Sequence, residues 1–201
     1  MVKRRQINKN KREKQKGNYE LCWKFLKENR IYFLIITLIF FFSTIFGFIF
    51  PVFFVDFIQQ FVENVVNATK DMNLFQLIIY IIENNVISSI TGMLFGVFLG
   101  IFPVLTALMN GYVLGFVASK SVAVAGISVL LRILPHGIFE IPALIISLGL
   151  GLRLGMFLFA RNKKKEFWYV FENSLKVFVY VVIPLLIVAG IIESLMIFVL
   201  G

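Results

Sequence analysis

The stretch PHGIFEIPA contains the only histidine of the chain, His136, and a glutamate, Glu140, four positions after it. Residues at i and i+4 share one face of a helix, so the imidazole and the carboxylate would lie side by side. Such a pair could bind a ligand or relay protons. Equally, His136 could bond backbone freed by Pro135 while Glu140 pairs with Arg132 or Lys120, and the sequence leaves both interpretations open.

The residue types needed for known catalytic sets are incomplete. A zinc hydrolase usually has three protein ligands and a general base, whereas one histidine with one glutamate falls short. Ser88 and Ser89 lack the strained Gly-x-Ser-x-Gly turn of a serine hydrolase. The single cysteine, Cys22, excludes disulfides within the chain and any zinc-type Cys/His spacing. We therefore predict no catalytic residues, no metal and no cofactor, and the sequence favours a non-enzymatic role.

The elements that position these residues are membrane spans. Hydrophobic residues make up 59% of the 201, phenylalanine alone contributes 24, and several runs approach the ~20 apolar residues that cross a bilayer. The alternating pattern of transmembrane strands is not visible. The sequence predicts an all-α, multi-pass bundle in the cell membrane, with the lipid bilayer as its first partner.

Positive charge is concentrated before the first apolar run. Residues 1–30 contain eleven Lys/Arg against three Glu, which leaves +8 of the net charge of +9 in this arm. Lysines beside a span set its orientation and contact anionic lipid, so we expect a cytoplasmic N-terminus and no nucleic-acid partner. The predicted domains are a cytoplasmic basic amphipathic arm, 1–30, and a transmembrane helical domain, 31–201.

Apolar runs and their polar breaks predict five spans, at 31–54, 86–108, 111–133, 137–160 and 177–198. Amphipathic surface helices are expected at 56–73 and 74–83. The stretch Glu83–Asn85 is taken as one break and Asn110-Gly111 as a tight turn, which puts Lys120 in the middle of the third span. The main alternative has helices broken inside the membrane at these asparagines and at Pro135.

Small residues recur at intervals of four in two of the predicted spans. The two series are Ser88, Gly92, Gly96, Gly100 and Ala143, Ser147, Gly151, Gly155. Such faces let helix backbones approach closely, so we expect these spans to meet each other or a second copy of the chain. A homo-oligomer, with a dimer favoured, is the corresponding expectation.

The predicted topology gathers polar residues near the outer mouth of the bundle. This candidate ligand cluster comprises Glu83, Asn84, Asn85, Arg132, His136, Glu140 and Glu193. Ionisable groups at membrane depth usually face the bundle interior, paired or hydrated. Asn110 and Arg153 are expected nearer the inner face.

Four short motifs, NNVISS, NGYVLG, LPHGIFEIPA and GLGLRLG, occur over roughly residues 80–160. In order and spacing they resemble the stage II sporulation protein M family. The resemblance marks family signature positions, none with an established catalytic role: Asn84, Asn85, Asn110, Gly111, Pro135, His136, Gly137, Glu140 and Arg153. The family's named member is a multi-pass scaffold that assembles with two cell-wall-degrading partners in spore formers. Relatives also occur in archaea without murein, so sporulation itself is not predicted.

Two functional hypotheses follow. The first is a non-enzymatic scaffold that self-associates and recruits membrane or cell-envelope proteins. The second is a transporter or a small-ligand or ion-binding protein that uses the outer polar cluster, with proton coupling through His136 and Glu140. Intramembrane hydrolysis is a distant third.

Overall fold

The computed structural model describes residues 17–200, with side chains described for 17–130 and 137–199. This part of the chain is helical and contains no strand. The helices are α2 (Asn18–Glu28), α3 (Arg30–Ile49), α4 (Val55–Thr69), α5 (Leu74–Leu94), α6 (Ile101–Ala125), α7 (Leu130–Gly155), α8 (Lys163–Val177) and α9 (Ile183–Leu200). Shorter helical turns are η1 (Phe95–Val97), η2 (Ile127–Val129), η3 (Met156–Phe159) and η4 (Phe178–Val182).

Five helical stretches in the described residues are long and apolar enough to cross a membrane. They are Arg30–Ile49, Leu74–Val97, Ile101–Ala125, Gly137–Phe159 and Lys163–Val199. The prediction of an all-α bundle with five spans is confirmed. In the last stretch the π-helical turn η4 joins α8 to α9 without a break.

The span boundaries predicted at Glu83–Asn85 and at Asn110-Gly111 are wrong. Glu83–Asn85 lies inside α5, and Asn110-Gly111 lies inside α6. In hydrocarbon every backbone group needs a partner within its helix, so asparagine does not end a helix there, and Asn110 bonds the carbonyl of Thr106 at 2.9 Å. The chain turns instead at 95–100, where Leu99 and Gly100 have φ of 56° and 70°.

The predicted second and third spans are therefore displaced by about ten residues. No separate surface helix exists at 74–83, and α7 runs continuously through Pro135. Lys120, expected at mid-span, lies only five residues before the end of α6. There its ammonium group sits 5.5 Å from the Phe116 ring and can extend toward the membrane surface, which avoids most of the cost of burial.

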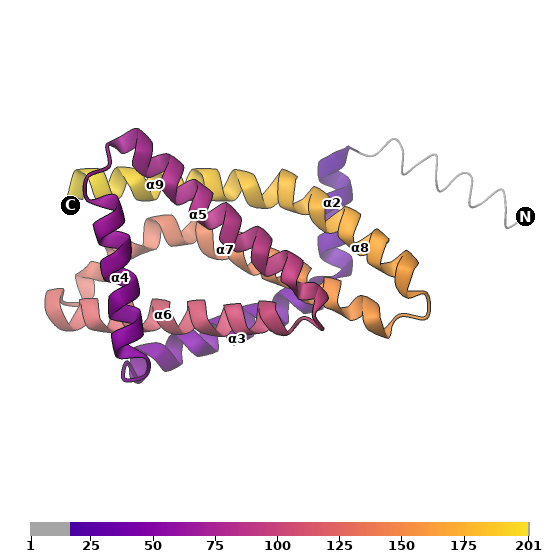
Figure 1. The fold of residues 1–201 in the computed structure, drawn as a ribbon, viewed down its shortest axis with the longest axis horizontal. Helices are drawn as coiled ribbons and strands as arrows, with labels where there is room; N and C mark the ends of the chain where they lie inside the picture. The colour runs from indigo at the N-terminus through magenta and orange to yellow at the C-terminus, as the bar shows by residue number, and fades with distance from the viewer. Residues whose placement is uncertain (1–16, 201) are drawn as a thin grey trace, which may run out of the picture.

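α7 occupies the centre of the bundle and contacts α3, α5, α6 and α9. In Figure 1, α3 and α6 lie side by side along one edge, and α5 with α9 along the other. The amphipathic helix α4 crosses one end, near the C-terminus, and α2 crosses the opposite end. The α3–α6 contact is close because a Cβ at Gly111 or Gly115 would overlap backbone carbonyls of α3.

The two small-residue series face each other within one chain. A Cβ at Gly96 would overlap the carbonyl of Gly151, and one at Gly155 would overlap the backbone at Gly100. Ser88 lies outside this contact and is exposed, while Ser89 is buried. Steps of four residues advance 400°, so the series drifts by about 40° per step, and two steps carry Ser88 away from α7. No second copy is needed to cover these faces.

Gly151→Ala should lower the stability of the fold, and Gly137→Ala on the same helix should not. A Cβ at position 151 would lie 2.8 Å from the carbonyl oxygen of Gly92, whereas at position 137 it meets one side-chain atom at 3.4 Å. Overpacking costs about 1–3 kcal/mol, while alanine at an unobstructed helical glycine gains up to about 1 kcal/mol. Thermal unfolding in detergent checks the pair, and equal melting temperatures would contradict the packing.

The predicted orientation can be tested at the two ends of the bundle. Lys164, at the start of α8, and Asn67, in α4, are both exposed and lie at opposite ends. In a Cys22→Ser background, we expect Lys164→Cys to be protected from an impermeant thiol reagent in intact cells and Asn67→Cys to be labelled. Labelling of Lys164→Cys together with protection of Asn67→Cys would contradict the predicted orientation.

Candidate functional site

The candidate ligand cluster predicted from the sequence is only partly described by the structure. The side chains of Arg132, Pro135 and His136 lie outside the described residues, so the arrangement of the His136–Glu140 pair stays a prediction. Glu140 on α7 and Glu193 on α9 are each partly buried. Gly137, in the first half of α7, has room beside it and makes no close backbone contact.

Asn85 is the residue of the Glu83–Asn85 stretch that turns toward the bundle. Further along α5 the helix packs closely on α7, because a Cβ at Gly92 would meet the Leu148 side chain and a Cβ at Gly151 would meet the carbonyl of Gly92. The Nδ2 atom of Asn85 is buried and has no hydrogen-bond partner among the described residues. The structure thus separates Asn85, which faces inward, from its neighbours Glu83 and Asn84, which are exposed.

A crevice of about 440 Å³ lies between α5 and α6. Its lining combines polar and apolar side chains: Asn84, Ile87, Ser88, Thr91, Gly92, Phe95, Phe102 and Thr106. Two of the lining residues, Phe95 and Phe102, form an aromatic cluster with Phe98, with ring centroids 5.4–6.0 Å apart. The crevice is a groove that stays open along one side.

The polar wall of this crevice lies within a membrane span. Glu83 is the tenth residue of the stretch Leu74–Val97, about 14 Å along it, and Asn84, Ser88 and Thr91 follow on the same exposed face. Every exposed side chain of α3 between Ile31 and Ile49 is apolar, as contact with lipid requires. Polar side chains at such depth normally face protein or water. The exposed face of α5 is therefore a surface that lipid alone does not satisfy.

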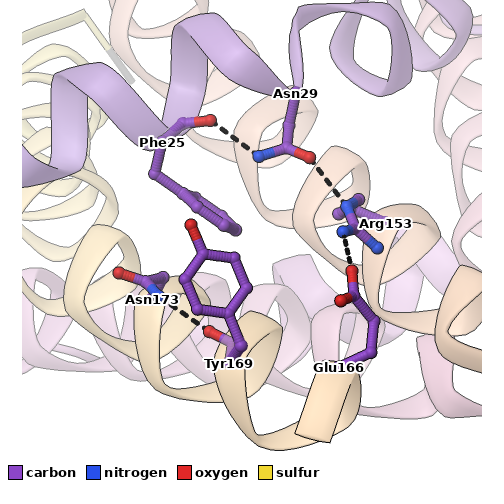
Figure 2. Close-up of polar contacts among 6 residues, drawn as sticks. All are labelled: Phe25, Asn29, Arg153, Glu166, Tyr169 and Asn173. Atoms are coloured by element: carbon purple, nitrogen blue, oxygen red, sulfur yellow. Dashed lines mark hydrogen bonds and ion pairs between the residues drawn. The ribbon is translucent and has the colours of Figure 1, made fainter. Parts of the chain in front are cut away.

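A second cluster of polar side chains connects the α2–α3 junction, α7 and α8 (Figure 2). It lies at the end of the bundle opposite α4. Arg153, in the last turn of α7, donates from Nε to Oδ1 of Asn29 at 2.7 Å and forms an ion pair with Glu166. Asn29 in turn donates from Nδ2 to the carbonyl of Phe25 at 2.8 Å. The guanidinium also lies 5.7 Å from the Tyr32 ring. We call these three residues, Asn29, Arg153 and Glu166, the Arg153 network.

Local sequence explains why the Arg153 network forms. Asn29 is the junction residue between α2 and α3, Arg153 ends α7, and Glu166 lies in the first turn of α8. A cation at a helix C-terminus and an anion at a helix N-terminus both complement the helix dipoles. The Nε and Nη2 atoms of Arg153 connect α7 to the α2–α3 junction and to α8, so the network is a structural clamp between these helices. Of the three residues in the network, the sequence analysis named only Arg153. Glu166 could have been found from the stretch RNKKKE, where it is the single acid at the end of a basic run.

The residue after the signature pair Asn110-Gly111, Tyr112, holds the turn between α3 and α4. Its hydroxyl donates to the carbonyl of Phe50 at 2.9 Å and accepts from the amide of Phe53 at 3.0 Å. Tyr112 thereby fixes the turn from α3 into α4, where Phe54 has a φ of 55°. Asn110, exposed, bonds only its own helix, so this motif positions helices.

Fold and sites together define a five-span helical membrane protein with an uncovered polar crevice. The chain matches the model of the family Stage II sporulation protein M over residues 36–196, and it belongs to that family. It is also 40% identical over 92 residues to an uncharacterized protein of Methanocaldococcus jannaschii. That alignment covers 43% of this chain and 41% of the relative. No solved structure matches the chain.

The clamp function of Arg153 predicts strong coupling to Glu166. The Arg153 and Glu166 side chains are 14% and 34% exposed, whereas the pair Lys24–Glu28 on α2 is 42% and 50% exposed. A double-mutant cycle with alanine should give about 1–3 kcal/mol for Arg153–Glu166 and at most about 0.5 kcal/mol for Lys24–Glu28. Unfolding in detergent provides the measurement, and equal coupling energies would refute the clamp.

Proposed function

We propose that this protein is a non-enzymatic membrane scaffold that takes membrane-embedded helices, of its own copies or of other proteins, into the crevice between α5 and α6. The single observation that carries the proposal is the exposure of Glu83, Asn84, Ser88 and Thr91 on a spanning helix. A partner helix would cover these groups and supply their hydrogen bonds.

The energetics favour this use of the crevice. Hydrogen bonds between transmembrane helices contribute about 0.6–2 kcal/mol each, and Asn, Ser and Thr are the side chains that commonly form them. Three such residues, Asn84, Ser88 and Thr91, lie in one line on α5, with Thr106 opposite on α6. A helix entering the groove would meet several of these groups at once, which suits a binding surface for a helix.

Family membership agrees with a scaffold. The resemblance noted from the motifs implies an assembly role for the named member, and the described sites contain a structural clamp and a groove. The Arg153 network would then hold the inner ends of α3, α7 and α8 together while a partner occupies the groove.

One observation favours the second candidate, a small-ligand or transport site. The crevice volume of about 440 Å³ falls within the range typical of small-molecule sites, and its polar groups could orient a solute. The two functions differ in what fills the crevice: a helix would exclude water, whereas a polar solute site would be hydrated in its absence.

Asn84→Leu should weaken assembly without lowering the stability of the isolated chain, because the side chain is exposed in one copy. Loss of one interhelical hydrogen bond predicts about a threefold to thirtyfold lower assembled fraction. Chemical crosslinking in membranes measures assembly, and thermal unfolding in detergent measures stability. Phe42→Leu on the lipid-facing side of α3 is the matched control and should change neither.

Unchanged assembly of the Asn84→Leu variant would favour the small-ligand or transport site. If Asn84→Leu leaves the crosslinked complexes of native membranes unchanged, the crevice does not hold a helix and the scaffold proposal fails at this surface.

A further inference from the structure

We propose that the occupant of the crevice is α5 of a second copy of this chain. In this arrangement a twofold axis lies parallel to the membrane normal, and the α5 helix of each copy fills the groove between α5 and α6 of the other. The inference rests on the proposed function and names its partner. The crevice is then a site that one chain cannot complete alone.

The chemistry of the exposed face is self-complementary. The amide of Asn84 and the hydroxyls of Ser88 and Thr91 are each both donor and acceptor, so each can bond its own equivalent. A surface of one charge sign could not pair with itself in this way. Glu83, the acidic member, adjoins Asn84, whose amide in the other copy can donate to it.

The spacing of these residues fits a parallel helix pair. Asn84, Ser88, Thr91 and Phe95 follow one another at steps of four, three and four, the pattern of a seam between helices crossing at about 20°. Two copies inserted in the same orientation have parallel α5 helices. A twofold axis along the normal therefore sets each polar residue opposite its equivalent at the same depth.

Two other faces of the described bundle are less suited to self-association. The contacts of Gly96 with Gly151 and of Gly100 with Gly155 are internal to one chain, so the small-residue faces are not free to bind a second. The exposed side chains of α3 from Ile31 to Ile49 are apolar and suit lipid. The polar face of α5, in contrast to these two, has an unmet requirement for protein contact.

Disulfide trapping in native membranes tests the pairing on the full chain. Single cysteines replace Asn84, Ile87, Ser88 and Thr91 in turn in a Cys22→Ser background, and Leu38→Cys on α3 is the control because Leu38 is 62% exposed. Cys22 itself is 2% exposed, and burial raises the pKa of its thiol, so its own reactivity is low at neutral pH.

We expect a covalent dimer from at least one α5 position, at least about tenfold above Leu38→Cys, since about 1.4 kcal/mol of association preference already gives that ratio. No dimer from any of the four positions, or an equal yield from Leu38→Cys, would overturn the second copy as partner.

A photocrosslinker at Asn84 separates this failure from failure of the scaffold itself. An adduct of twice the mass of the chain supports the second copy. An adduct with a protein of different mass, and none with the chain, overturns the second copy but leaves the scaffold standing. No protein adduct at all overturns both.

Discussion

The backbone contact between the turn at 95–100 and α7 determines the rest of the bundle. Because the glycines at 96 and 155 carry no Cβ, the turn that joins α5 to α6 can lie directly on α7. From that point α5 runs to α9 and α6 runs to α3, so the two helices diverge with α7 behind them (Figure 1). The crevice is the consequence of this divergence.

Divergence exposes a face of α5 that differs from the exposed face of α3, whose side chains are apolar from Ile31 to Ile49. The face carries an acid, an amide and two hydroxyls near the middle of a membrane-spanning stretch, where hydrocarbon offers no partner. The clamp at Arg153 and the bonds of Tyr112 hold the two ends of the bundle, and neither satisfies this face. A single chain is thus well packed around α7 and leaves polar side chains of α5 uncovered.

Sequence reasoning predicted the class, the number of spans and the small-residue series, because composition and spacing encode these directly. It misplaced the boundaries of α5 and α6, since Asn84, Asn85 and Asn110 carry turn propensity that the membrane overrides. The actual turn at 95–100 is apolar apart from its glycines. The Arg153 network was missed because Asn29 and Glu166 lie 124 and 13 residues away from Arg153, and only folding brings them together.

The most direct measurement is the accessibility of a nitroxide at Ser88→Cys, compared with one at Leu38→Cys, in bilayers containing the Cys22→Ser chain. Oxygen reports contact with lipid, and a water-soluble paramagnetic complex reports contact with water. If a helix fills the crevice, the label at position 88 is shielded from both reagents while the label at position 38 collides freely with oxygen. Equal oxygen accessibility at the two positions, or strong access of the water-soluble reagent at position 88, would contradict a protein-filled crevice.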